Sequence, residues 1–198
     1  NGTWAQVSPG YYKGGPETQP SWYQTFQKNF TWDFIYQVKM KRSIAYDSAN
    51  AVIFWGTPTL GTTQNQWTDG VYFQYTNSGY WAVWRTVGNI WEFVQSWTTT
   101  TWVHPYDWNT LTVVVQYPYH YFYLNGGYLG YLGITNPNTG YAGIGYFSED
   151  PGGSLLVDKA TLEAIQTYTF EAPDPAMELG KEPAPAGMVP WESPTVKP

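Results

Sequence analysis

Residues 108–127, WNTLTVVVQYPYHYFYLNGG, alternate apolar and polar side chains on both sides of Tyr117-Pro118. This period of two is typical of β-strands, so we predict strands at 108–116 and 119–124 that pair as a hairpin. One face of the hairpin would carry Leu111, Val113, Val115, Phe122 and Leu124, and the other Thr112, Val114, Tyr121 and Tyr123. The next residues, Asn125-Gly126-Gly127, tolerate the positive φ that a second tight reversal requires.

Similar alternation recurs along the chain, interrupted by Gly, Asn and Pro, whereas helical periodicity is almost absent. Further strands are predicted at 32–40, 50–55, 71–75, 80–87, 90–97, 141–147 and 155–165. The last of these could also form a short helix, but its place after a series of strands favours a closing strand. We therefore predict an all-β fold, a jelly-roll sandwich of two antiparallel sheets over residues 29–167. Residues 1–28 are expected to be an irregular segment with a possible edge strand.

Two tight turns would set the strand register between residues 71 and 93. A two-residue turn at Ser78-Gly79 places Tyr72 opposite Arg85 and Phe73 opposite Trp84. A Gly-first type II′ turn at Gly88-Asn89 places Arg85 opposite Glu92, as an ion pair worth about 0.2–1 kcal/mol. The predicted core face carries Phe73, Tyr75, Trp84, Trp91 and Phe93. The predicted outer face carries Tyr72, Gln74, Trp81, Arg85 and Glu92.

The composition indicates one large domain, or one domain with an arm. Of 198 residues, 20% are aromatic and 12% are charged, so apolar surface for a core is plentiful. The net charge of -6 argues against nucleic acid and anionic membranes as partners. The chain has no cysteine, which excludes disulfides and thiolate metal sites, and it has no apolar run of the roughly 18 residues that a spanning helix needs. Because it begins with Asn1, we expect a processed, secreted chain without membrane insertion.

The last 31 residues, 168–198, differ in kind from the rest. They contain 7 of the 15 prolines and 5 acidic against 2 basic residues. Proline cannot donate regular ladder hydrogen bonds, so an extended, polyproline-like arm is predicted. Docking of this arm on another copy of the chain would use Met188, Val189 and Trp191 as its apolar anchors.

Four short motifs resemble those of the laminin G-like and concanavalin A-like jelly rolls, the lectin and glucanase superfamily. They are the W-N-x-L-x-V strand at 108–113, Y-x-N-G at 123–126, G-x-x-G-I at 140–144 and V-D-x-x-x-L at 157–162. The resemblance covers about residues 29–165. It implies two packed antiparallel sheets in a secreted or cell-surface protein. Such domains commonly bind carbohydrate or protein, and some hydrolyse glycans.

The sequence lacks the paired carboxylates that a glycanase needs. Similar β-glucanases carry two Glu and an Asp at alternating positions of one strand, because a nucleophile and an acid must project from one face about 5–5.5 Å apart. Here Glu92 stands alone beside Arg85, and Glu149-Asp150 falls in a turn. We therefore predict a protein that is not an enzyme.

No metal site or cofactor is predicted either. His104 and His120 are the only histidines and have no acidic or second histidine partner at ligand spacing, so we interpret them as a loop and a strand residue. Asp158 corresponds to a structural acidic position in similar folds. Some laminin G-like domains bind calcium through loop carboxylates, which leaves calcium open. The candidate aspartates are scattered along the chain: Asp47, Asp69, Asp107 and Asp150.

The aromatic surplus has two interpretations. Trp and Tyr stack on sugar rings, so a glycan platform is one of them, with candidates Tyr72, Gln74, Trp81, Arg85 and Glu92. The alternative is that these rings fill the core or a subunit interface. The sequons at Asn1 and Asn29 are candidate glycosylation sites. The Thr run 98–101 would carry O-glycans or form a strand edge.

Taken together, these features predict a non-catalytic extracellular structural or adhesive subunit. It would self-assemble with other copies of itself through its terminal arms, as a filament or surface layer. The alternative is a carbohydrate-binding module of a secreted or cell-surface protein, with glycans as partners. A glycanase that depends on Glu92 ranks third.

Overall fold

A computed structural model describes residues 4–7, 10–15, 21–28, 33–43, 48–58, 67–135, 140–148 and 153–165. Several sequence predictions lie outside these described residues. They are the arm with Met188, Val189 and Trp191, the sequons at Asn1 and Asn29, and the carboxylates of Asp47, Glu149 and Asp150.

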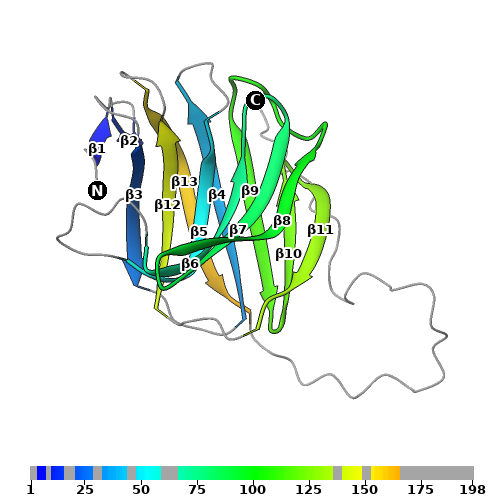
Figure 1. The fold of residues 1–198 in the computed structure, drawn as a ribbon. Coiled ribbons are helices and arrows are strands. Elements are labelled where there is room, and N and C mark those ends of the chain that lie inside the picture. Colours follow the sequence, from blue (N-terminus) through cyan, green and yellow to red (C-terminus); the bar gives the residue numbers. More distant parts are fainter. Residues whose placement is uncertain are drawn as a thin grey trace. The chain divides into compact units, whose positions relative to one another are not determined.

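The described residues form thirteen strands in two antiparallel sheets (Figure 1). The seven-stranded sheet has the order β1 (Trp4–Val7), β2 (Tyr11–Gly14), β13 (Leu155–Ala164), β4 (Phe34–Arg42), β9 (Asn109–Gln116), β10 (Tyr119–Leu124) and β11 (Gly127–Gly133). The six-stranded sheet has the order β3 (Ser21–Lys28), β12 (Tyr141–Ser148), β5 (Asn50–Thr57), β6 (Asp69–Tyr75), β7 (Tyr80–Val87) and β8 (Ile90–Thr99). The predicted all-β sandwich is confirmed, and residues 155–165 do form a closing strand rather than a helix.

The core lies between the inner faces of the two sheets. Burial alternates strictly along β4, as expected for a strand with one face in the core. The β9–β10 hairpin has the predicted register, with Tyr119 opposite Gln116. All five apolar side chains assigned to its inner face are fully buried: Leu111, Val113, Val115, Phe122 and Leu124.

Two asparagines of the sequence motifs, Asn109 and Asn125, fix the open end of this hairpin through side-chain hydrogen bonds. The buried Asn109 side chain accepts a hydrogen bond from the His104 backbone N–H (2.8 Å) and donates to the His104 carbonyl (2.8 Å). Its Oδ1 also accepts from Asn125 Nδ2 at 2.8 Å. Asn125, at φ 52°, accepts from the Thr110 N–H through its own Oδ1 (2.8 Å). The asparagines of the W-N and N-G motifs therefore connect the loop before β9 to the turn after β10, which is a structural role.

The segment 1–28 was expected to be irregular with a possible edge strand. Its described residues form three strands, of which β1 and β3 stand at the ends of their sheets and β2 is interior. The strand β11 was missed. The strands β1 and β2 are joined through Gly10 (φ 112°), and Gly15 (φ 89°) follows β2. Glycine makes such conformations accessible at no steric cost, so a Gly-rich segment still forms paired strands here. β11 contains three glycines in seven residues, which hid its alternation in the sequence.

The predicted register between β6 and β7 is wrong by one residue. Tyr72 lies opposite Trp84, and Tyr75 lies opposite Trp81. The connection is a three-residue loop, Asn77-Ser78-Gly79, closed by a hydrogen bond from the Thr76 N–H to the Tyr80 carbonyl (2.9 Å), instead of a two-residue turn. A shift of one residue moves every side chain of a strand to the other face of the sheet.

The second turn gives the predicted register, since Arg85 does lie opposite Glu92. Its predicted type II′ is wrong, because Gly88 and Asn89 both have positive φ, as in a type I′ turn. The corrected register places Trp81 in the core and brings Trp84, Trp91 and Phe93 to the outer face.

Candidate functional site

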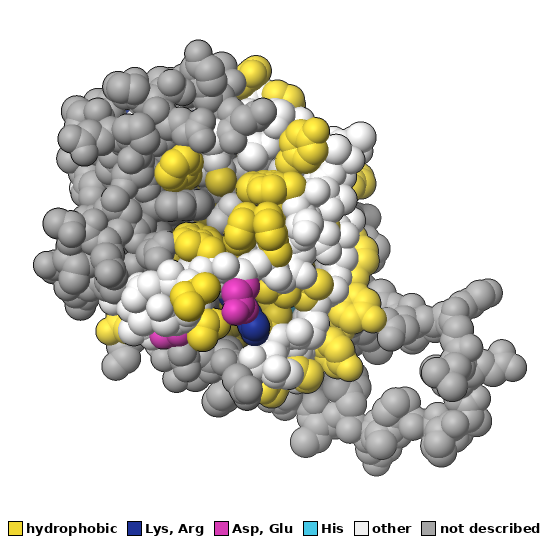
Figure 2. All heavy atoms as spheres, in the orientation of Figure 1, with side chains coloured by type: hydrophobic (Ala, Val, Ile, Leu, Met, Phe, Trp, Pro, Cys, Tyr) yellow, Lys and Arg dark blue, Asp and Glu magenta, His cyan; other side chains and the backbone are white. Residues whose placement is uncertain are grey.

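Aromatic side chains cover part of the outer face of the six-stranded sheet. We call Tyr72, Trp84, Trp91 and Phe93, from β6, β7 and β8, the aromatic face. The ring centroids are 4.5 Å apart for Tyr72 and Trp91, 5.8 Å for Trp84 and Trp91, and 3.4 Å for Trp84 and Phe93. Figure 2, in the orientation of Figure 1, shows apolar side chains over the region where β7 and β8 lie, with an acidic and a basic side chain in contact among them.

Trp67 packs in one buried cluster with Tyr72, separate from the main core. It is buried, and its backbone N–H donates to the Tyr72 hydroxyl at 3.1 Å. The indole packs on glycines, because a Cβ at Gly143 would approach it to 2.6 Å. Solvent exposure therefore increases across the aromatic face from Tyr72 to Phe93. Tyr72 is fully buried, Trp84 and Trp91 are half-buried, and Phe93 is 49% exposed.

Two polar groups on the same face have hydrogen-bonding capacity that the described residues do not use. Gln74 is only 2% exposed, and its Nε2 has no hydrogen-bond partner among the described residues. The same holds for Oγ1 of Thr86, which lies opposite Trp91 on the neighbouring strand. A buried polar atom without a partner costs about 1–3 kcal/mol, so such atoms call for water or a ligand group.

The outward positions of β6 hold no carboxylate. They are Gly70, Tyr72 and Gln74, whereas a glycan hydrolase needs two carboxyl groups facing one another. On β8, Glu92 accepts a hydrogen bond from Arg85 Nε at 2.7 Å, and both side chains are partly exposed.

The five residues predicted as a glycan platform do not form one surface. Tyr72 and Gln74 lie on the outer face, whereas Trp81 is in the core against Phe73 and Phe122. Arg85 and Glu92 point to the opposite side of their strands from Trp84 and Trp91. Their role in binding stays a prediction. Trp84, Trp91 and Phe93 were predicted to lie in the core. They lie on the outer face because the β6–β7 loop is one residue longer than the predicted turn.

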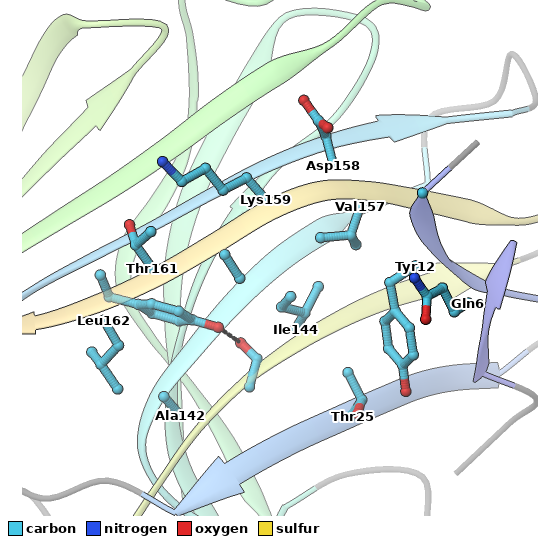
Figure 3. A pocket seen from close by; sticks show the side chains of 14 residues that line it. Gln6, Tyr12, Thr25, Ala142, Ile144, Val157, Asp158, Lys159, Thr161 and Leu162 are labelled. Carbon is cyan, nitrogen blue, oxygen red and sulfur yellow. Dashed lines mark hydrogen bonds between the residues drawn. The ribbon is translucent and has the colours of Figure 1, made fainter. Parts of the chain in front are cut away.

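A cavity of about 620 Å³ opens between the two sheets (Figure 3). Its apolar lining includes Ala142, Ile144, Val157 and Leu162. Tyr36 crosses it, donating from its hydroxyl to the Gly143 carbonyl at 2.9 Å. In Figure 3, Asp158 and Lys159 lie on the other side of the β13 ribbon from Val157 and Leu162. The cavity thus extends the apolar core, and its one lining carboxylate, Asp158, pairs with Lys39 (2.6 Å).

His120 is a buried structural histidine. The Trp55 indole N–H donates to His120 Nε2 at 3.0 Å, so the proton sits on Nδ1, which lies 3.1 Å from the Pro118 carbonyl. Burial lowers the pKa of His120 to about 4, so the ring is neutral at physiological pH. His104 is an exposed loop residue, as expected.

Within the ranges that the structure describes, no group of three His, Cys, Asp or Glu side chains could hold a metal ion. Asp107 lies 3.5 Å from Lys41, and Asp69 accepts a hydrogen bond from the Gly88 N–H (3.1 Å). The calcium prediction stays untested. The described residues include no helix long and apolar enough to cross a membrane.

No protein-family model and no curated protein sequence matches the chain. Solved structures with a similar fold include the carbohydrate-binding module CBM66 from Bacillus subtilis, with a TM-score of 0.61 at 14% identity, covering 83% of this chain and 92% of that one. The carbohydrate recognition domain of Emp47p has a TM-score of 0.61 at 12% identity, covering 83% and 86%. A β-glucanase from Bacillus licheniformis has a TM-score of 0.60 at 12% identity, covering 82% of each chain. At these identities the likeness concerns the fold alone, and binding domains and a hydrolase share it.

Proposed function

We propose, from the concanavalin A-like jelly-roll fold that this chain adopts, that it is a non-catalytic carbohydrate-binding module of an extracellular protein. The ligand would be a neutral glycan, bound on the outer face of the six-stranded sheet. The single observation that carries the proposal is the aromatic face, where Trp84 and Trp91 pack against the buried cluster that contains Tyr72 and Trp67, and Phe93 contacts Trp84.

The aromatic face suits the chemistry of a sugar. A pyranose or furanose ring has an apolar C–H side, which gains from contact with an aromatic ring, and hydroxyls around its edge, which need hydrogen bonds. Trp84, Trp91 and Phe93 offer rings, while Gln74 Nε2 and Thr86 Oγ1 are polar groups without described partners that lie buried on the same face. Packing on Tyr72 keeps Trp91 in place before the ligand arrives, which lowers the entropy cost of binding.

The absence of a carboxylate from the outward positions of β6 supports the non-catalytic part of the proposal. We expect no release of reducing sugar from any glycan that binds, and no change in this result for Glu92→Gln. The similar structures named as carbohydrate-binding domains also favour binding over self-assembly through the terminal arm. The arm and its anchors Met188, Val189 and Trp191 stay a prediction.

The test is a titration of neutral gluco-, manno-, galacto- and fructo-oligosaccharides, followed by calorimetry or tryptophan fluorescence. We expect one class to bind, and Trp91→Ala to weaken its binding at least tenfold. Trp102→Ala is the control, since Trp102 is an indole, 47% exposed, that packs on Gly127, away from the aromatic face. Equal affinity of the Trp91→Ala variant and the wild type, with a native circular dichroism spectrum, would refute this site.

A further inference from the structure

A second set of aromatic rings lies on the outer face of the seven-stranded sheet. We call it the tyrosine face, and it consists of Tyr119, Tyr121, Tyr123, Tyr128 and Tyr131, all from β10 and β11. Tyr131 contacts both Tyr119 (ring centroids 5.9 Å apart) and Tyr121 (5.8 Å). The Tyr123 and Tyr128 ring centroids are 5.4 Å apart. The five rings therefore form two adjoining groups on one pair of strands.

The tyrosine face is open to solvent. Tyr119, Tyr128 and Tyr131 are 48%, 51% and 45% exposed, while Tyr121 and Tyr123 are half-buried among them. Alternate residues of a strand are about 6.7 Å apart, so the three tyrosines of β10 extend over about 13 Å. This length matches several sugar units of an extended chain better than one small molecule.

The chemistry around these rings is neutral. Residues 108–147 contain no Asp, Glu, Lys or Arg. On β9 the neighbours are Val114, opposite Tyr121, and Thr112, opposite Tyr123. Thr112 accepts a hydrogen bond from Gln37 Nε2 at 3.0 Å. The surface thus combines aromatic rings with phenol, hydroxyl and amide groups, and it fits a neutral occupant with apolar faces and hydroxyls.

A second copy of this chain fits the tyrosine face less well. Each copy carries a net charge of -6, which opposes close approach of two copies. Pairing through the β11 edge is also impeded, because the β10–β11 register shifts at Phe122 and Tyr123 and Gly130 has a φ of 149°. A bulge of this kind bends an edge strand and breaks the regular ladder that another strand would extend.

We propose that the tyrosine face is a second glycan-binding surface, which takes an extended neutral polysaccharide and makes the protein bivalent. The inference depends on the proposed function for the class of ligand, but it concerns a different sheet. The tyrosine face and the aromatic face lie on the outer surfaces of opposite sheets. One short oligosaccharide cannot reach both, whereas two polysaccharide chains can be cross-linked, with the gain in avidity that linked sites give.

The test compares the full chain with two double variants, Tyr119→Ala/Tyr131→Ala and Trp91→Ala/Phe93→Ala. The first readout is the affinity for a short oligosaccharide, which reports on the aromatic face. The second is retardation in native gels that contain soluble mixed-linkage β-glucan, mannan or levan, together with light scattering when protein and polymer are mixed. Tyr119→Phe/Tyr131→Phe is the matched control, because it keeps the rings.

We expect the Tyr119→Ala/Tyr131→Ala variant to keep its oligosaccharide affinity within twofold, to lose at least fivefold in gel retardation and to lose the scattering that marks cross-linking. The Phe control should keep both. Unchanged scattering for a folded Ala variant would overturn the inference. So would a wild-type dimer in sedimentation that the Ala pair dissociates, because the face would then join two copies. A wild type that binds oligosaccharide without cross-linking polymer refutes this inference alone, whereas one that binds no oligosaccharide on the aromatic face refutes the proposed function.

Discussion

Acid should destabilise the protein through His120. The ring is fully buried and its Nε2 accepts the Trp55 indole N–H, so a second proton on Nε2 would break that hydrogen bond and place a charge in the core. Burial lowers its pKa from 6.5 to about 4, whereas the unfolded chain keeps the ordinary value. The unfolded state therefore binds more protons between these two pH values, and stability falls as the pH falls through that window.

The size of the effect follows from the two pKa values. One pKa unit corresponds to 1.36 kcal/mol, so the free energy of unfolding should drop by about 2.5 kcal/mol between pH 7 and pH 4.5 on account of this group. Urea unfolding at both pH values measures it. His120→Gln removes the titration and should abolish most of that drop, while His104→Gln, at an exposed loop position, should leave it intact. A His120→Gln variant with the same pH dependence as the wild type would refute the assignment of a buried neutral imidazole.

Three further predictions concern stability. Trp81→Ala should lower the free energy of unfolding in urea by about 3–5 kcal/mol, because it leaves a cavity in the core. A decrease below about 1 kcal/mol would indicate that Trp81 lies on the surface. Asn109→Ala should lower the free energy of unfolding by about 2–4 kcal/mol, since it leaves backbone groups of His104 and Asp107 without their hydrogen bonds. A melting temperature equal to that of the wild type would contradict this prediction. Arg85→Ala should cost at most about 1 kcal/mol, and 1 M salt should reduce the cost further, because the pair with Glu92 is partly exposed; a larger cost that is independent of salt contradicts this.

The β9–β10 hairpin could be predicted from sequence because its information is local. Alternation is strict on both strands, and the inner-face residues, such as Val113 and Phe122, are apolar without exception. The same is true of the Gly88-Asn89 turn, whose two residues both adopt positive φ. Where a turn and the flanking alternation agree, the register follows.

The β6–β7 register could not be predicted because Thr76-Asn77-Ser78-Gly79 is compatible with either a two-residue loop, Ser78-Gly79, or a three-residue loop, Asn77-Ser78-Gly79. The structure selects the longer one, in which the Thr76 hydroxyl contacts the Ser78 hydroxyl at 2.8 Å. Both strands carry aromatic residues on both faces, so hydrophobicity does not discriminate between the registers. The exchange of Trp81 and Trp84 between core and surface, and with it the position of the candidate site, follows from this one ambiguity.

Other features depend on tertiary contacts and leave no local signal. The hydrogen bond between Trp55 and His120 joins residues 65 positions apart. The tyrosine face requires β11, whose three glycines concealed it as a strand. The predicted hairpin did place Tyr121 and Tyr123 on the face opposite the core, so two of the five tyrosines of that face were predicted from the sequence.

The indole N–H signals in a heteronuclear NMR spectrum test the central claim most directly. During titration with the oligosaccharide that binds, the signals of Trp84 and Trp91 should shift and saturate together with the calorimetric affinity. Those of Trp81, buried in the core, and of Trp102, beyond the aromatic face, should stay in place. A binding isotherm that moves Trp102 or Trp81 and leaves Trp84 and Trp91 unchanged would contradict a glycan site on this sheet.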